Sequence, residues 1–422
     1  MKTISYIIAF TTLLFSFSCQ QKTTKEENLK EVAYEAFIYA HPMMEQVKTL
    51  NGMFDFMGMK PNVPAMNDKF PMDNIGLPIV APNFTSMTGG VFIDISEGPV
   101  TVEIPEVKDR YIVYQCVDVF THNFYYMGTR ANQGEGGQFT FYNKHQVVSN
   151  DGSTPVLMEG DHALIINRID IKDRSELERV REIQNAIKVV AAPEKTKAYP
   201  AYDKEKAFSP RFVEYVNDLL ITVPEPEVDL FDRFKAIGIK NEVALSKEQL
   251  SEVQAGIDSA YQAIKNENKN LEIGNGYFTS NDIFGTREFL DGYYIGRAAG
   301  ADFGLWGNSK EEANYFMLYT EGEGEINFKS DELPPLTKIG FWSIAVHDEN
   351  VLVAKNKYDS YVLTMDQMQF EEDGSLTLKI SSKPEEGNWL YTPGGKMVIG
   401  IRAYQADPEK IGDYVPPAFI KG

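Results

Sequence analysis

The side chains best suited to acid–base chemistry lie between residues 110 and 130. The run from Tyr111 to Phe120 is apolar and aromatic, as in a β-strand, with Asp118 near its end and His122 just beyond it. A carboxylate in such a strand must be paired or solvated, because an isolated buried charge is costly. Asp118 as base or orienter, with His122 as general acid–base, would make a hydrolase-like arrangement.

The alternative role for Asp118 is structural. Arg110 or Arg130 could pair with it, and the buried bridge would hold the predicted turn 121–130 in shape. The candidate catalytic set is therefore Asp118, His122, Arg130 and Arg110. The sequence has no Gly-x-Ser-x-Gly elbow, so an ordinary serine hydrolase has no support. Since no His or Cys pair has metal-ligand spacing, we predict no metal and no cofactor.

A second group of residues is aromatic and could bind a ligand. Trp and Tyr beside Arg and Asn can form a stacking platform for a sugar or another planar-faced molecule. The candidate ligand-binding residues are Trp342, Asn388, Trp389, Arg402 and Tyr404. Trp342 also alternates with Ile344 and Val346, which equally fits the buried face of a strand. Asn388 and Trp389 are predicted to lie in a loop.

The elements that must position these residues suggest a mainly β protein. Short β-rich runs separated by Gly, Pro, Asn or Asp occupy residues 90–170, and similar runs return after residue 315. This pattern predicts two jelly-roll-like β-sandwich lobes with helical insertions. We expect a first lobe with an N-terminal helix at 28–172, a helical connecting region at 173–270 and a second lobe at 271–422. Residues 58–84 are predicted to form a long ordered loop.

Helical periodicity is clearest in two places. Residues 26–57 repeat apolar side chains at three- and four-residue steps, with a predicted break or kink at Pro42. Ser246 and Gln249 form a capping box ahead of an apolar stripe that continues to Ile264. We expect both stripes to face the core.

The amino terminus predicts export. Lys2 precedes an apolar run that is too short to span a membrane, and the run ends at Ser18-Cys19. A small residue before Cys fits lipoprotein processing with acylation of Cys19, although Ser16 replaces the usual Leu. The alternative is an ordinary signal peptide. We predict a lipoprotein signal at 1–19 and a polar tether at 20–27, with the protein anchored in the cell envelope, on either face of the outer membrane.

Charge and cysteine content limit the partners. The formal net charge of −20 argues against nucleic acid and against electrostatic binding to anionic lipid. No other stretch could span a bilayer, so we expect a water-soluble body that reaches the membrane through its lipid only. Cys116 lies in an apolar run and is predicted to be a buried structural thiol.

Short sequence motifs, spaced along both lobes, resemble those of a known family. In the first lobe they are Val80-Ala81-Pro82-Asn83, Asp94-Ile95-Ser96, Pro99-Val100, Arg110-Tyr111, Gln115, Asp118, Thr121, Asn123-Phe124 and Gly128-Thr129-Arg130. In the second they are Arg297-Ala298, Tyr315, Phe341-Trp342-Ser343, Asn356, Tyr358, Tyr361, Asp373-Gly374-Ser375-Leu376, Asn388-Trp389-Leu390, Pro393, Arg402-Ala403-Tyr404 and Pro416-Pro417. The first lobe resembles the bacterial domain-of-unknown-function family 1254, and the second resembles family 1214.

The resemblance covers about residues 28–422 and implies a pair of mainly β, jelly-roll-like lobes, but no settled activity. The chain departs from the family where Pro-Asn is usually followed by Asn-Asp-Thr and then Tyr. Here Phe84-Thr85-Ser86 and Thr88 stand at those positions.

Three functions remain open. The first is an envelope lipoprotein that binds a small or oligomeric organic ligand, such as a glycan, as a binding or accessory protein. The second is a metal-independent hydrolase or lyase that uses Asp118 and His122. The third is a structural component of the envelope.

Overall fold

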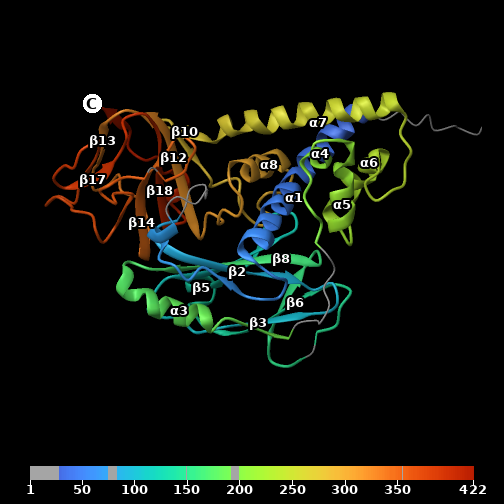
Figure 1. The fold of residues 1–422 in the computed structure, drawn as a ribbon, viewed down its shortest axis with the longest axis horizontal. Coiled ribbons are helices and arrows are strands. Elements are labelled where there is room, and N and C mark those ends of the chain that lie inside the picture. The colour runs from blue at the N-terminus through green and yellow to red at the C-terminus, as the bar shows by residue number, and fades with distance from the viewer. Residues whose placement is uncertain (1–27, 75–82, 149, 192–198, 354) are drawn as a thin grey trace, which may run out of the picture.

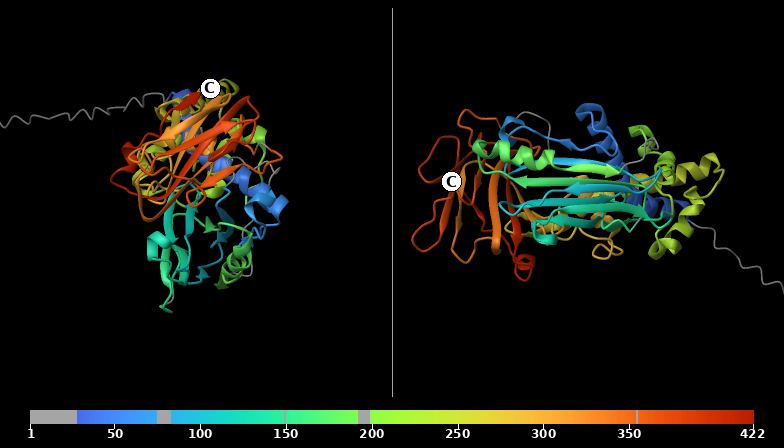
Figure 2. Two further views of the ribbon diagram at one scale, coloured as in Figure 1. Left: turned by 90° about the vertical axis from the view of Figure 1, so that its left-hand side faces the viewer. Right: turned by 90° about the horizontal axis from the view of Figure 1, so that it is seen from below.

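The computed structural model describes residues 28–74, 83–148, 150–191, 199–353 and 355–422. The predicted signal peptide, Cys19 and the tether lie outside the described residues. Two β-sheet lobes and a group of helices make up the described part, and Figures 1 and 2 show the helices beside both lobes. The prediction of a mainly β fold with helical insertions is confirmed.

The first lobe is a sandwich of two sheets. Their strand orders are β1-β2-β8-β4-β5 and β7-β6-β3-β9. The strands are β1 (Ala65–Met66), β2 (Ser86–Asp94), β3 (Val100–Ile104), β4 (Ile112–Asp118), β5 (Asn123–Gly128), β6 (Gly137–Asn143), β7 (Thr154–Met158), β8 (His162–Asp170) and β9 (Lys188–Ala191). Alternate residues of each strand face the space between the sheets, where Val91, Val102 and Ile165 belong to one apolar core. Because β9 pairs with β3, this sandwich extends beyond residue 172.

The second lobe is also a sandwich of two sheets. Its strand orders are β10-β11-β12-β18-β14-β15 and β17-β16-β13-β19. The strands are β10 (Glu272–Gly274), β11 (Tyr277–Thr279), β12 (Ala313–Glu321), β13 (Gly324–Phe328), β14 (Leu336–Asp348), β15 (Val362–Thr364), β16 (Leu376–Ser381), β17 (Asn388–Tyr391), β18 (Lys396–Ala406) and β19 (Phe419–Lys421). Long antiparallel pairing of β18 with β12 and β14 builds the centre of the larger sheet.

Most of the helices pack around α1 in one core, whereas α2 and α3 lie against the first lobe. The helices are α1 (Leu29–Met57), α2 (Thr129–Asn132), α3 (Leu177–Asn185), α4 (Lys204–Ala207), α5 (Val213–Leu219), α6 (Val228–Phe234), α7 (Lys247–Glu267) and α8 (Tyr294–Phe303). The Asn28 side chain caps the start of α1, and Gly58 ends it with a φ of 66°. Contrary to the predicted break, α1 is a single helix through Pro42.

Close packing of α7 on α1 depends on one glycine. A Cβ atom at Gly256 would lie 2.4 Å from the Lys30 carbonyl oxygen, so only glycine permits this approach. The predicted apolar stripes of both helices lie in their shared core, which includes Val32, Val253 and Ile264. Among the described residues, none of the helices combines the length and apolarity needed to cross a bilayer.

The two lobes meet along an aromatic surface that we call the seam. It consists of Tyr111, Val113 and Tyr126 of the first lobe and Ala313, Tyr315, Phe341 and Tyr404 of the second. The rings of Phe341 and Tyr404 are stacked with centroids 4.6 Å apart, and the Tyr111 ring lies 5.6 Å from that of Tyr404. Aromatic contacts of this kind stabilise the association of the lobes.

Candidate functional site

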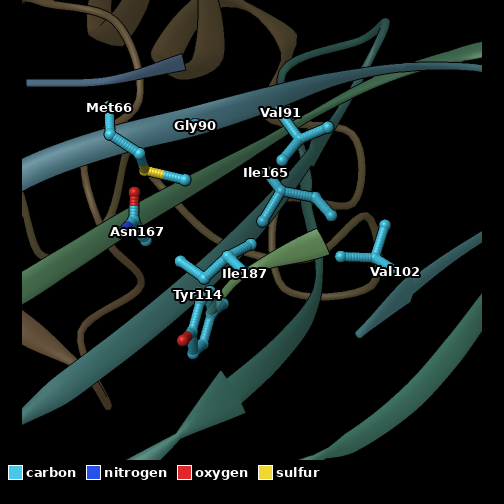
Figure 3. Close-up of a pocket in the computed structure, with 8 residues that line it drawn as sticks. All are labelled: Met66, Gly90, Val91, Val102, Tyr114, Ile165, Asn167 and Ile187. Carbon is cyan, nitrogen blue, oxygen red and sulfur yellow. The ribbon is translucent and has the colours of Figure 1, made fainter. Parts of the chain in front are cut away.

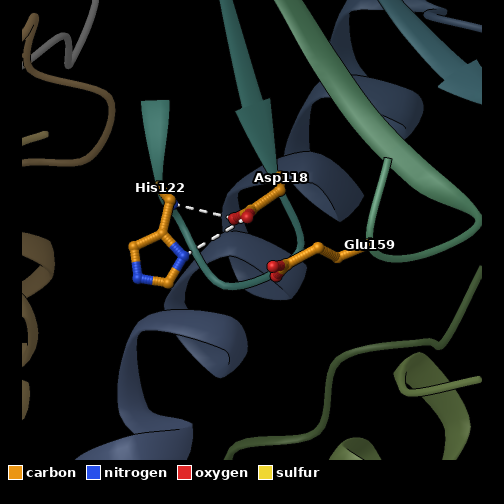
Figure 4. Close-up of side chains that lie close together, drawn as sticks. All are labelled: Asp118, His122 and Glu159. Carbon is orange, nitrogen blue, oxygen red and sulfur yellow. Dashed lines mark hydrogen bonds and ion pairs between the residues drawn. The ribbon is translucent and has the colours of Figure 1, made fainter. Parts of the chain in front are cut away.

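Asp118 and His122 lie close together at the end of β4, as Figure 4 shows. One oxygen of Asp118 (Oδ1) accepts hydrogen bonds from the backbone N–H groups of Phe120 and His122, at 2.9 and 2.8 Å. The other (Oδ2) lies 3.3 Å from Nδ1 of His122. Both residues are only 4% exposed. The predicted pair is therefore assembled, but it is closed to a substrate.

An arginine that the sequence does not associate with this pair lies beside it. The Arg287 guanidinium binds Glu159, with Nε 3.0 Å from the Glu159 carboxylate, and its Nη1 lies 2.7 Å from Glu227 Oε1. It also lies over the ring of Phe120 at 4.6 Å. Tyr39 donates a 2.5 Å hydrogen bond to Glu227 from α1. Ion pairs and one hydrogen bond thus connect the surface carboxylate of Glu159, through Arg287 and Glu227, to Tyr39 in the helical core.

Arg297 on α8 fixes the same turn from the other side. It is 3% exposed and donates to the backbone carbonyls of Phe120 and Tyr39, at 2.5 and 2.8 Å. Its guanidinium lies 4.7 Å from the centre of the Tyr39 ring. One buried cation therefore joins α8, α1 and the turn after β4, which is a structural role.

The electrostatic surroundings favour an ionised Asp118. Burial opposes ionisation, but the charge and hydrogen bonds of His122 and the charge of Arg287 outweigh it, so the pKa of Asp118 lies below its usual range. Such a group is a poor proton acceptor near neutral pH. Its properties suit a fixed anion better than a general base.

The same residues offer the best geometric arrangement for a metal among the described residues. Asp118, His122 and Glu159 place one ligand atom each within 4.8 Å of one another. Because Arg287 already neutralises Glu159, a divalent cation would have to displace a guanidinium. The site therefore fits its own arginine better than a metal ion.

Neither predicted arginine partner binds Asp118. Arg110 contacts Glu176 at 3.3 Å and donates to the Asp170 carbonyl at 3.2 Å. Arg130 donates to Glu312 at 2.6 Å, across the seam. The prediction of an Asp118 bridge to Arg110 or Arg130 is therefore wrong. The arginine whose charge helps to lower the pKa of Asp118 is Arg287, which comes from a distant part of the chain.

The residues of the predicted aromatic platform do not lie together. Trp342, Arg402 and Tyr404 are on the two faces of the larger sheet of the second lobe, whereas Asn388 and Trp389 are in its smaller sheet. Trp342 is 2% exposed and packs in the core of the second sandwich. The prediction that Trp342 contributes to a ligand-binding surface is therefore wrong. Asn388 lies in strand β17, not in a loop, and bonds the backbone of Gln369 through both amide atoms. Trp389 is half-buried and donates to Ser381 Oγ at 2.9 Å. These residues support the fold.

Arg402 and Tyr404 lie on the opposite face of β18, toward the first lobe. Alternate residues Ile399, Ile401 and Ala403 enter the core, so Arg402 and Tyr404 point away from it. The Tyr404 hydroxyl accepts a 2.8 Å hydrogen bond from Asn83 of the first lobe. Of the five predicted ligand residues, only these two lie where the lobes meet.

Sequence comparison assigns the chain to a family. A profile described as "Protein of unknown function (DUF1254)" matches residues 61–191, and one described as "Protein of unknown function (DUF1214)" matches residues 311–408, in that order. The chain belongs to this two-domain family. No curated protein sequence matches it.

One of two similar solved structures shares the fold of this chain. The VPA0106 protein from Vibrio parahaemolyticus is 19% identical, with a TM-score of 0.74, and the alignment covers 93% of this chain and 100% of that one. A putative uncharacterized protein from Burkholderia cenocepacia is 12% identical with a TM-score of 0.45, over 88% of this chain and 85% of that one. The first likeness establishes the fold and nothing about activity.

The position where the chain departs from the family pattern lies near the seam. Thr88 on β2, at the position where the family resemblance implies a Tyr, pairs across the sheet with Arg168 on β8. Arg168 donates to Gln115 Oε1 at 2.6 Å and to the Trp306 carbonyl at 3.0 Å. Sequence inspection missed Arg168, because no pattern around it distinguishes it from a surface arginine on a strand.

Two pockets differ in what they could hold. Figure 3 shows the first, between the sheets of the first lobe, where the Asn167 amide is directed toward Met66 in otherwise mainly apolar surroundings. Both amide atoms lack a hydrogen bond among the described residues, yet the space is too small for a water molecule. The second measures about 410 Å³ and lies at the end of β12 and β18. Only the second has room for a ligand.

Proposed function

We propose that this protein is an envelope lipoprotein that binds a small or oligomeric organic ligand, with a saccharide as the favoured class. The observation that carries the proposal is the pocket of about 410 Å³ on the second lobe, which is within the usual range for small-molecule sites. Its lining residues are Tyr319, Thr320, Glu321, Glu349, Lys396 and Met397.

The chemistry of this pocket suits a sugar. Tyr319 is 47% exposed, and its ring rests edge-on against Phe278 at 5.8 Å, which restricts its orientation. An exposed ring face can stack on the C–H face of a sugar. Glu321, Glu349 and Lys396 add charged groups that can bond hydroxyls. Shallow aromatic and polar surfaces of this kind bind without a deep cavity.

Tyr319→Ala should lower the affinity for any saccharide that stabilises the wild-type protein by about tenfold, because about 1.4 kcal/mol of stacking is lost. A thermal-shift screen against envelope glycans, followed by calorimetric titration, measures this. Phe370→Ala removes another exposed aromatic ring, outside the pocket lining, and should leave the affinity unchanged. Equal binding by wild type and Tyr319→Ala would overturn the pocket assignment.

Attachment through Cys19 is the second part of the proposal. Replacing Cys19 by Ser should move the protein from the membrane to the soluble fraction, because each buried acyl CH₂ group contributes about 0.8 kcal/mol to anchoring. The measurement is fractionation of cells that express each variant. Ser18→Ala keeps a small residue before the cysteine and should stay in the membrane. Membrane retention of Cys19→Ser would refute the anchor.

The enzyme alternative rests on one observation, the 3.3 Å contact between Asp118 and His122. It would gain support from turnover that is lost in Asp118→Asn while ligand binding persists. The burial of both side chains and the low pKa of Asp118 favour binding over catalysis.

A further inference from the structure

Three charged side chains line the pocket on the second lobe, and the strand register places them in a row. Glu321 on β12 pairs with Lys396 on β18. On the other side of β18, Asp348 of β14 pairs with Met397. Glu349 follows Asp348, so it continues this register beside Lys396. Neighbouring strands are about 4.8 Å apart, and Lys396 therefore lies between two carboxylates. All three charged side chains are exposed, so a ligand can reach them.

The two carboxylates of this row differ in their partners. Glu321 binds Lys421 at 3.0 Å. The hydrogen bond and charge of Lys421, together with the charge of Lys396, hold the pKa of Glu321 below its usual range. Glu349 has no ion pair and no side-chain hydrogen bond among the described residues. A ligand can therefore bind the Glu349 carboxylate without breaking an existing ion pair.

The charge of this region favours a cationic ligand. Next to Glu349, the Asp348 carboxylate accepts hydrogen bonds from the backbone N–H groups of Asn350 and Leu352, at 2.9 and 2.8 Å, and adds a third negative charge. Two lysines, Lys396 and Lys421, oppose these three carboxylates. The whole protein carries a formal net charge of −20. A field of this sign attracts cations and repels anions.

The distance between the aromatic and acidic parts of the pocket limits the size of the ligand. Val398 pairs with Tyr319 on one side and with His347 on the other. Glu349 is thus two strands and two residues away from Tyr319, so their Cα atoms are about 12 Å apart. A ligand that covers both positions is longer than one sugar ring, which favours an oligosaccharide.

We propose that the pocket binds an oligosaccharide that carries free amino groups. One sugar ring stacks on Tyr319, the ammonium group of a neighbouring unit binds the Glu349 carboxylate, and Lys396 donates to a hydroxyl. This inference rests on the proposed function, because it names the ligand class of the same pocket. An acidic saccharide is disfavoured, because the Lys396 ammonium already faces two carboxylates.

Three trisaccharides with the same backbone test the proposal on the purified full chain. Chitotriose, cellotriose and triacetylchitotriose carry an ammonium, a hydroxyl and an acetamide group, respectively, at each C2 position. At pH 6, chitotriose should bind about fivefold tighter than either neutral sugar in a calorimetric titration, because an exposed ion pair adds a modest free energy. At pH 9, where the sugar amine is uncharged, this preference should disappear.

Glu349→Gln should bind chitotriose no tighter than cellotriose, and its affinity for cellotriose should equal that of the wild type. Because Glu349 is exposed, this variant should keep the thermal midpoint of the wild type. Glu372→Gln is the matched control. It removes an exposed carboxylate outside the pocket lining, changes the net charge equally and should keep the preference for chitotriose.

The amino-sugar class is overturned if the wild type binds chitotriose and cellotriose equally or binds no chitotriose, or if the preference persists in Glu349→Gln. Tighter binding of trigalacturonate than of chitotriose would also overturn it. In each case the saccharide function stands as long as the glycan screen finds a ligand that depends on Tyr319. A screen without any such ligand overturns the proposed function as well.

Discussion

Glu312→Ala should lower the free energy of unfolding by about 3 to 5 kcal/mol, because three donors would lose their acceptor and each buried donor left unsatisfied costs about 1 to 3 kcal/mol. Glu312 is 1% exposed and accepts hydrogen bonds from Tyr111 at 2.7 Å, Arg130 at 2.6 Å and Gln405 at 2.8 Å. Two of these donors belong to the first lobe and one to the second. Alanine would leave all three without their acceptor, at the surface where the lobes meet.

Urea unfolding followed by tryptophan fluorescence measures this loss. The control is Glu178→Ala, which removes the carboxylate of an exposed ion pair with Arg181 and should change the stability by less than about 1 kcal/mol. If Glu312→Ala lost no more than this control, the seam would not depend on the buried carboxylate.

The order of β-rich and helical runs was enough to predict a mainly β fold with helical insertions. Short β-rich runs with turn residues between them, at 90–170 and after residue 315, predicted the two groups of strands that form the lobes. The same rule failed at β5, because residues 121–130 were predicted to be a turn. No Gly or Pro separates β4 from β5, and the chain reverses through Thr121, which has a φ of 71°. The turn forms without a glycine because the Asp118 carboxylate accepts hydrogen bonds from two backbone N–H groups of the turn.

The candidate site was less predictable, since its partners come from distant parts of the chain. The sequence suggested that Asp118 needs a cation, but nothing in it indicates Arg287 over the nearer Arg110 and Arg130. Composition also could not separate a buried Trp342 from an exposed one, because both fit a strand. Arg168 lacked any local signal, and its position became meaningful only when its uncharged partners were visible.

Asp118→Asn decides between a structural and a catalytic role for this residue. Asparagine keeps one oxygen for the two turn N–H groups but removes the charge that faces His122 and Arg287. We expect a loss of about 2 to 4 kcal/mol in the free energy of unfolding at pH 7, the scale for removing a buried charged partner. The exposed Asp55 on α1 is the matched control, and Asp55→Asn should change the stability by less than about 0.5 kcal/mol.

The pH dependence distinguishes this charge effect from a simple loss of packing. Because the folded-state pKa of Asp118 is lowered, its contribution is fully present above the unfolded-state pKa of about 3.9 and is lost as the pH falls through the folded-state value. The difference between wild type and Asp118→Asn should therefore be largest at neutral pH and shrink as the pH falls below about 4. Urea unfolding at pH 7, 5 and 3 measures it. A difference that stays constant across this range would show that the charge of Asp118 does not contribute to stability. A variant that is as stable as the wild type but has lost turnover of a substrate would support a catalytic role for Asp118.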